Sequence, residues 1–161
     1  MKEIIYLVGQ ISIDKIETYE WRKYVREYFK GNASFEIVDP CNNGFNGGIL
    51  SNAGHDKTRS KVYKMKGASL LVPKDISYVK RSTIGLANLN HYDKIKAMIG
   101  TPFELSIYRD NPDKAVIGIF NGDPTKDTLC NHPFVRETID TWVTDEKEAC
   151  ELIEYFYKDL E

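Results

Sequence analysis

Two uninterrupted apolar segments constrain the fold of this chain more than any other feature. Residues 115–120 read AVIGIF, and residues 4–8 read IIYLV. Apolar runs of this kind, without alternating polar residues, are typical of strands that are covered on both faces, as in parallel sheets. Parallel strands need long crossover connections, which are usually helices. The two segments therefore predict an α/β fold built on a parallel sheet.

Strand-like and helix-like segments alternate along the rest of the chain. Further strands are predicted at residues 35–38, 83–90 and 138–143. Apolar residues recur at helical spacing over residues 17–30 and again after Asp145, a favourable N-cap residue. We therefore expect a single domain over residues 1–161, folded as a three-layer α/β/α sandwich around a parallel sheet of about five strands. This architecture is Rossmann-like or flavodoxin-like.

The composition excludes several classes of protein. Apolar residues make up 42% of the chain and charged residues 29%, which is ordinary for a soluble globular protein. The net charge is −2 and there is no long run of Lys or Arg, so we expect no nucleic-acid partner. The apolar run near the amino terminus is too short for a secretion signal or a membrane span. We expect a cytoplasmic protein without a membrane partner.

The cysteine and glycine patterns argue against a metal or a nucleotide cofactor. Cys41, Cys130 and Cys150 are odd in number, far apart and without CxxC spacing, so they predict reduced thiols with neither zinc nor a disulfide. No GxGxxG follows the first predicted strand, and no GxxxxGK[ST] occurs in the chain. These absences disfavour Rossmann NAD binding and P-loop chemistry, and we expect no cofactor.

Residues 41–67 read as a loop-rich insertion. The segment 42–48 is too rich in Asn and Gly for a regular element, and a long loop at the carboxyl end of a strand is often functional, although a mobile surface loop is the alternative. Five basic residues lie between positions 57 and 66 and form either a solvated face or a contact for a phosphate. A short apolar run then ends at Pro73, and a brief helix is expected from Ile76.

The segment IGTPFELS at residues 99–106 is the strongest candidate for chemistry. Pro102 suits the first position of a helix, which places Glu104 within the first turn. A helix start offers unpaired N–H groups and a partial positive charge that favour a carboxylate or an anionic ligand. The alternative is a plain capping box, with Thr101 as the N-cap and Glu104 as its return half.

Ligands of open α/β sheets bind just outside the carboxyl ends of the strands. Tyr6, Gly9 and Gln10 lie at the end of the first predicted strand, although Tyr6 also suits a half-buried strand position. Asp75 and Glu104 fall where other elements meet the same edge. Two such carboxylates can act as a pair, one stabilising or attacking a sugar carbon while the other protonates the leaving group. The alternative for Asp75 is a helix cap or a surface acid.

The chain resembles the nucleoside 2-deoxyribosyltransferase family and its nucleotide N-glycosidase relatives. The resemblance rests on YLVG at residues 6–9, KDI at residues 74–76 before ANL at residues 87–89, and GTPFE at residues 100–104, in that order over nearly the whole chain.

This resemblance implies a covalent mechanism. Glu104 would attack the anomeric carbon of a 2′-deoxynucleoside or its 5′-monophosphate, and another base or water would collect the sugar. Asp75 would assist the departing base as an acid, and Tyr6 would orient the nucleophile. The resemblance also implies substrate contacts at a set of further residues: Gly9, Gln10, Asn88, Gly100 and Thr101.

The family resemblance extends to assembly. Its members are commonly homodimers or larger, with tyrosines near the carboxyl terminus that complete a neighbour's site. Tyr155 and Tyr157 are the candidates here, with simple helix packing as the alternative.

Two positions depart from the family pattern. Met98 stands where the transferases carry an aspartate and the monophosphate hydrolases a serine, and Gly9-Gln10 stands in place of Gly-Pro. The alternative functions are therefore a non-catalytic nucleotide-binding or sequestering protein on the same fold, and an α/β interaction domain without a small-molecule site.

Overall fold

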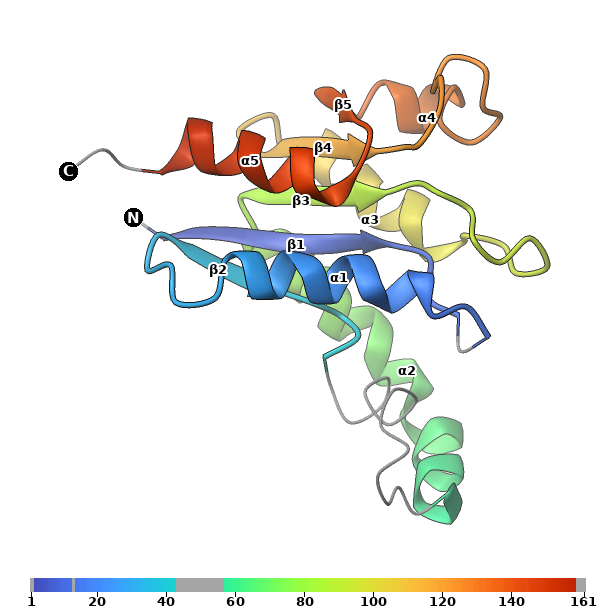
Figure 1. Ribbon diagram of the computed structural model, residues 1–161. Helices are drawn as coiled ribbons and strands as arrows, with labels where there is room; N and C mark the ends of the chain where they lie inside the picture. Colours follow the sequence, from blue (N-terminus) through green and yellow to red (C-terminus); the bar gives the residue numbers. More distant parts are fainter. Residues whose placement is uncertain (1, 13, 43–56, 159–161) are drawn as a thin grey trace.

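The computed structural model describes residues 2–12, 14–42 and 57–158 of the chain (Figure 1). Its elements in chain order are β1 (Glu3–Gly9), α1 (Glu17–Tyr28), β2 (Phe35–Val38), α2 (Lys57–Arg81), β3 (Ile84–Asn88), α3 (Gly100–Arg109), β4 (Ala115–Ile119), α4 (Pro133–Arg136), β5 (Thr141–Val143) and α5 (Glu146–Tyr157).

The strands form one sheet in the order β2-β1-β3-β4-β5, and every neighbouring pair is parallel. This confirms the predicted parallel sheet of five strands. β1 lies between β2 and β3, with Ile5 opposite Ile37 on one side and Ile84 on the other. Because all strands run the same way, their carboxyl ends gather at one edge, where the ligands of such sheets bind.

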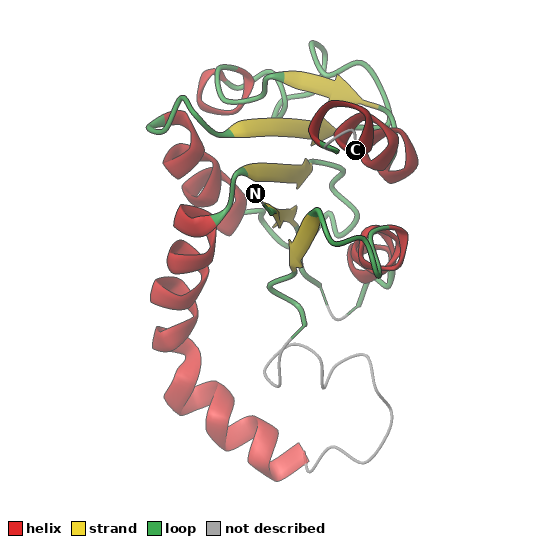
Figure 2. Cartoon of the chain, turned by 90° about the vertical axis from the view of Figure 1, so that its left-hand side faces the viewer, coloured by secondary structure: helices red, strands yellow, loops and turns green. Residues whose placement is uncertain are grey.

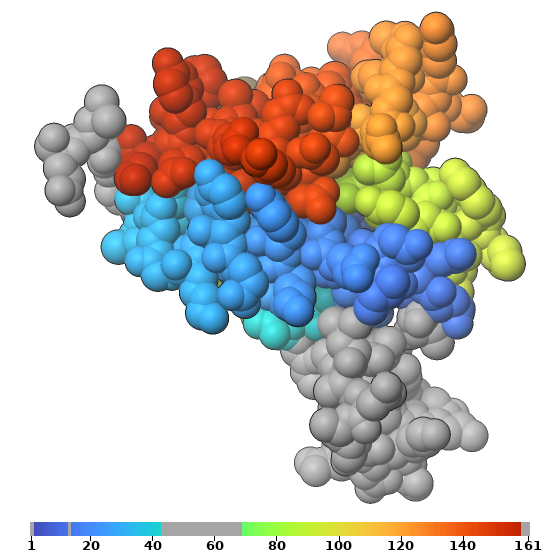
Figure 3. All heavy atoms as spheres, in the orientation of Figure 1, coloured from blue at the N-terminus to red at the C-terminus, as the bar shows by residue number. Residues whose placement is uncertain are grey.

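Helices cover both faces of the sheet, which confirms the three-layer architecture. Successive strand side chains point to opposite faces, so Ile5 and Leu7 of β1 face α1 and α5, whereas Tyr6 and Val8 face α2 and α3. Figure 3 shows α1 and α5 lying side by side over the first face.

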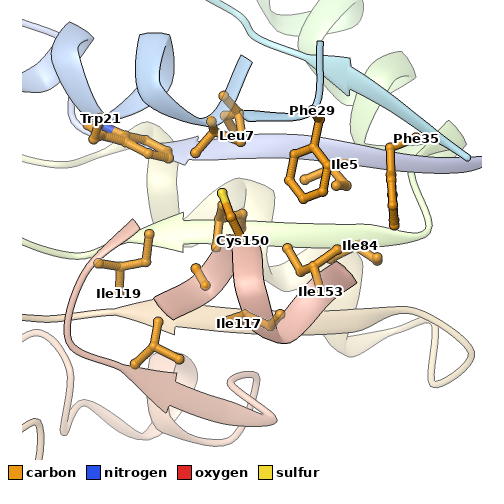
Figure 4. Packing of buried hydrophobic residues seen from close by; sticks show 14 residues of the cluster. Ile5, Leu7, Trp21, Phe29, Phe35, Ile84, Ile117, Ile119, Cys150 and Ile153 are labelled. Carbon is orange, nitrogen blue, oxygen red and sulfur yellow. The ribbon is translucent and has the colours of Figure 1, made fainter. Parts of the chain in front are cut away.

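The core beneath α1 and α5 consists of buried apolar side chains (Figure 4). Trp21 of α1 and Phe29, the C-cap residue of that helix, share this cluster with Cys150 and Ile153 of α5, and all four lie on the same face of the sheet. The amphipathic pattern at residues 17–30 therefore represents core packing. Asp145 caps α5, as expected, and its Oδ1 accepts a hydrogen bond of 2.9 Å from the backbone N–H of Glu148.

The predicted brief helix from Ile76 is wrong, because α2 is a single helix of 25 residues that contains Pro73. Residues 57–67, predicted as part of a loop-rich insertion, belong to this helix. The rest of the predicted loop, residues 43–56, lies outside the described residues. Figure 2 shows the amino-terminal half of α2 projecting beyond the β2 edge of the sheet. The sequence of α2 mixes basic and apolar residues and contains one proline, and this pattern does not indicate where the helix begins.

The capping-box interpretation of residues 101–104 is also wrong. α3 begins at Gly100, its N-cap is Ile99, and no side-chain hydrogen bond caps it. Thr101 is therefore inside the helix and buried. The carboxylate of Glu104 accepts a hydrogen bond from Tyr6 on β1 instead.

Smaller differences concern the ends of elements and the thiols. β3 and β5 are shorter than the predicted segments 83–90 and 138–143, because the flanking residues turn into loops. Cys41, Cys130 and Cys150 are free and buried. Among the helices of the described part of the chain, none is both long enough and apolar enough to cross a membrane.

Candidate active site

Tyr6 and Glu104 meet at the interface between β1 and α3. The Tyr6 side chain is buried on the α2–α3 face of the sheet, and its hydroxyl donates a hydrogen bond of 2.7 Å to Glu104 Oε1. These two residues are 98 positions apart in the sequence. The pairing therefore depends on α3 packing across β1, which the structure provides.

Burial dominates the electrostatics of Glu104. It raises the pKa of this carboxyl group from its ordinary 4.5 to about 7, although the Tyr6 hydrogen bond and the positive charge of Arg22 both lower the pKa. The negative charge of Asp75 raises it further. A carboxyl group that titrates near neutrality is typical of catalytic sites.

The Tyr6 hydroxyl remains protonated over the whole physiological range. Burial raises its pKa far above the ordinary value, and the negative charges of Glu104 and Asp75 add to this effect. Tyr6 therefore acts as a fixed hydrogen-bond donor. A donor to the ionised carboxylate stabilises that form and fixes its orientation.

Asp75 lies on α2 and joins the same electrostatic cluster. Burial raises its pKa, and the adjacent Lys74 ammonium lowers it. Asp75 Oδ1 is shielded from solvent and forms an ion pair with Lys74, whose Nζ lies 3.2 Å away. The structure joins Tyr6 and Glu104 by a hydrogen bond, and Asp75 is near enough for its charge to raise the pKa of both.

A small cavity of about 250 Å³ opens beside Lys74, between the edge strand β2 and the helix α2. Tyr78 and Arg81 line it from α2, and the Arg81 guanidinium lies 5.0 Å from the centre of the Tyr78 ring. Val38 lines it from β2. Lys74, which lines this cavity, is ion-paired with Asp75.

Gly9 must be a glycine at this position. Its φ is +154°, and an added Cβ would lie 2.8 Å from the carbonyl oxygen of Asn88 and 3.3 Å from the Trp21 ring. The close approach keeps the ends of β1 and β3 together, because Gly9 and Asn88 are register partners. Gly9 therefore shapes the edge at which the site lies.

The side chains of Gln10 and Asn88 hold loops at this edge. Gln10 Nε2 donates to the carbonyl oxygens of Asp93 and Lys96, both at 2.9 Å, and its Oε1 accepts from the Asp93 N–H at 2.8 Å. Asn88 Oδ1 accepts from the backbone N–H of Asn90 at 3.0 Å. Both side chains were predicted to contact substrate, and both already have protein partners.

The residues at the start of α3 differ in accessibility. Gly100 is exposed, with open space where a Cβ would stand, whereas Thr101 is buried. Met98 is only 9% exposed and packs in the core cluster that includes Leu105 and Tyr6. The position at which the resemblance leads us to expect Asp or Ser therefore carries a side chain that belongs to the core.

The interpretation of the sequence missed Arg22, a fully buried arginine on α1. Its guanidinium donates to the carbonyl oxygen of Gly9 at 3.0 Å, and its charge acts on Tyr6 and Glu104. One signal was available. Position 22 falls on the same helical stripe as the buried residues 18, 25 and 29, where a charged residue is unusual.

Two further observations bear on partners and metals. Tyr155 is 82% exposed, and Tyr157 packs partly against the core. In the part of the chain that the structure describes, no group of three His, Cys, Asp or Glu side chains is arranged to hold a metal ion.

Comparison with solved structures finds the same fold over most of the chain. A conserved protein from Enterococcus faecalis V583 is 12% identical, with a TM-score of 0.57 and coverage of 96% of this chain and 99% of that chain. A 2-deoxyribosyltransferase from Bacillus psychrosaccharolyticus is 16% identical, with a TM-score of 0.55 and coverage of 91% and 89%. No family model and no curated protein matches. At these identities the likeness shows a shared three-layer α/β fold.

Proposed function

We propose that this chain cleaves the N-glycosidic bond of a 2′-deoxynucleoside or of its 5′-monophosphate, and transfers the sugar to another base or to water. The observation that carries the proposal is the 2.7 Å hydrogen bond from the Tyr6 hydroxyl to Glu104 Oε1, at a partly buried carboxylate beside Asp75. The fold shared with the 2-deoxyribosyltransferase from Bacillus psychrosaccharolyticus supports it.

In the first step a Glu104 oxygen attacks the anomeric carbon of the sugar. The bond between this carbon and the base nitrogen breaks, and its electron pair leaves with the base. A glutamyl–sugar ester results. In the second step the nitrogen of another base, or the oxygen of water, attacks the same carbon and releases the Glu104 carboxylate. Tyr6 holds the carboxylate in orientation throughout, since its hydroxyl stays protonated.

Asp75 supplies the proton that the departing base needs. Burial raises its pKa, which favours the protonated acid, although the Lys74 ammonium 3.2 Å from its Oδ1 lowers the pKa. In the second step Asp75 takes a proton back from the attacking base or water.

The remaining predicted residues form the frame of the proposed site. Gly9 and Asn88 fix the edge of the sheet, and Gln10 fixes the loop that leads to α3. Gly100 leaves open space beside α3, and Thr101 anchors the first turn of this helix through burial. Assembly into a homodimer or larger oligomer, with Tyr155 at the neighbour's site, remains part of the proposal.

The test is a substrate panel. Purified protein is incubated with each deoxynucleoside and each deoxynucleoside 5′-monophosphate, with and without a free base, and the products are separated by chromatography. We expect free base from at least one substrate, and Glu104→Ala should lower this rate by at least about 10³-fold. Glu20→Ala removes an exposed glutamate of α1 and serves as the matched control. Turnover of none of the substrates would contradict the proposal.

A second candidate is a nucleotide-binding protein without glycosidic chemistry. The observation that favours it is Met98, which puts an apolar core residue where a polar sugar or phosphate contact would stand. In that case a nucleotide should remain bound through purification, and mass spectrometry after denaturation would detect it. Retention of an uncleaved nucleotide, together with no turnover in the panel, would favour this function.

A further inference from the structure

Gln10 is a polar side chain that is buried directly after β1 ends. It is only 5% exposed, and both N–H groups and the oxygen of its side-chain amide have protein partners. Its Nε2 donates to the carbonyl oxygens of Asp93 and Lys96, each at 2.9 Å, and its Oε1 accepts from the Asp93 N–H at 2.8 Å. A buried amide that is satisfied in this way holds its partners in fixed positions.

The partners of Gln10 lie in the loop of residues 89–99, which joins β3 to α3. This loop has little backbone hydrogen bonding of its own. Within the described part of the chain, residues 90–97 form a single backbone–backbone hydrogen bond, from the Lys96 N–H to the Asp93 carbonyl oxygen at 3.3 Å. The loop therefore depends on the Gln10 side chain, which anchors it to the end of a strand that is paired on both sides.

A second set of side chains strengthens the same connection. Ser12 is buried, and its Oγ donates to Asp93 Oδ2 at 2.5 Å. Lys96 Nζ donates to Ser12 Oγ at 3.2 Å and to Asp14 Oδ2 at 2.8 Å. We call Gln10, Ser12, Asp93 and Lys96 the loop clamp. It ties the chain that leaves β1 to the chain that enters α3.

The loop clamp closes a ring that contains the candidate active site. β1 carries Tyr6 and ends at the clamp, and the clamped loop leads into α3, which carries Glu104. The hydrogen bond of 2.7 Å from the Tyr6 hydroxyl to Glu104 Oε1 completes the ring. The apolar packing of α3 has no directional preference, whereas this hydrogen bond needs its two atoms within a narrow range of distance and angle. The loop clamp supplies a directional link between β1 and α3.

We propose that Gln10 is a positioning residue for Glu104: by holding the loop that enters α3 against the end of β1, it sets where the Glu104 carboxylate stands relative to the Tyr6 hydroxyl. Gln10 does not touch the substrate, because the loop occupies its amide. The role rests on the proposed function, in which Glu104 is the nucleophile. A misplacement of about 1 Å in a catalytic site can lower the rate by about 100-fold.

The direct test observes the Tyr6 hydroxyl without any substrate. Carbon-13 NMR of tyrosine labelled at Cζ reports the hydrogen bonding of the ring hydroxyl, and Tyr6→Phe assigns the signal. Gln10→Met keeps the length of the side chain and removes its hydrogen bonds. We expect Gln10→Met to move the Tyr6 signal in the same direction as Glu104→Ala, which removes the acceptor altogether, and by a smaller amount.

Asn111→Leu is the matched control. Asn111 Nδ2 donates to the Ile107 carbonyl oxygen at 2.6 Å, so this variant also removes a hydrogen bond from a side-chain amide to the backbone of α3, at the end of the helix opposite to the loop clamp. It should leave the Tyr6 signal unchanged. An equal movement in Asn111→Leu, or an unchanged signal in a folded Gln10→Met protein, would overturn the role of Gln10.

Ser12→Ala decides the question if Gln10→Met does not fold. It removes the hydroxyl that joins Ser12 to Asp93 and leaves Gln10 in place. The Tyr6 signal should again move in the direction that Glu104→Ala gives. An unchanged signal in Ser12→Ala would then overturn the positioning role.

Kinetics provide a separate readout. Gln10→Met should lower kcat by about 10-fold and leave KM within about threefold of wild type, because it displaces the nucleophile and removes no substrate contact. In a Tyr6→Phe background the same substitution should lower kcat by less than about threefold, since both changes act through one hydrogen bond. Losses that multiply in the double variant would overturn the role. Because the NMR test needs no substrate, failure of the substrate panel would refute the proposed function and leave the test of Gln10 intact.

Discussion

Replacing Glu104 with Gln should stabilise the protein at alkaline pH. The pKa of Glu104 is about 7 in the folded protein and 4.5 for an ordinary glutamate. Between these values the folded state binds more protons than the unfolded state, so the free energy of unfolding falls as the pH rises. Gln is a neutral isostere that keeps an oxygen to accept the Tyr6 hydrogen bond. The free energy of unfolding of Glu104→Gln therefore does not fall with rising pH for this reason.

The size of the effect follows from the two pKa values. Each pH unit between them corresponds to about 1.4 kcal/mol, which gives an upper value of about 3 kcal/mol. Because Glu104 is partly exposed, solvent reduces the effect, and we expect about 2 kcal/mol. The gain of Glu104→Gln over wild type should be a few tenths of a kcal/mol near pH 4.5 and should reach its full size above pH 7.

The assay is urea unfolding followed by tryptophan fluorescence at pH 4.5 and pH 8. Melting temperature gives a second readout, and at pH 8 the variant should melt about 4–8 °C above wild type. Glu20→Gln removes an exposed charge on α1 and should change stability by less than about 0.5 kcal/mol at both pH values. A gain of equal size at both pH values, or no gain at pH 8, would refute the burial of Glu104 as the cause of its raised pKa.

Three further substitutions test the site and its frame. Tyr6→Phe removes the hydrogen-bond donor to Glu104 and should lower kcat by about 10- to 100-fold. The acid side of the pH–rate profile should move to higher pH, and an unchanged profile would contradict the role of the hydroxyl. Gly9→Ala should lower the free energy of unfolding in urea by at least about 2 kcal/mol, because the new Cβ would lie too close to the Asn88 carbonyl oxygen. An unchanged free energy of unfolding would mean that β1 and β3 can separate to accept the methyl group. Tyr108→Phe removes the hydroxyl that lies 2.5 Å from the buried Ser82 Oγ, and it should lower the free energy of unfolding by about 1–3 kcal/mol. The pH–rate profile should stay unchanged, and a shifted profile would refute this purely structural role.

The local features of the fold were readable from the sequence. Apolar runs at residues 4–8 and 115–120 became β1 and β4, and the stripe at residues 17–30 became α1. These predictions succeed because burial on two faces, or on one helical stripe, leaves a pattern in neighbouring residues. The length of α2 was not readable, because its amino-terminal half lacks a clear apolar stripe, and Gly67 and Pro73 inside the helix are residues that usually interrupt one.

The sequence by itself determined the class of fold and the residue types of the candidate site: Tyr6, Asp75 and Glu104. Only the tertiary structure decided what each of them contacts. It excluded the alternative of a capping box at Glu104, whose carboxylate accepts the hydrogen bond of the Tyr6 hydroxyl. It also bound the side-chain amide of Gln10 to a loop and placed a buried Arg22 against the carbonyl oxygen of Gly9 at the end of β1. The physical reason is that secondary structure follows from patterns over a few residues, whereas the pKa and the partners of a side chain depend on groups that are distant in sequence and meet only when the sheet and its helices have packed.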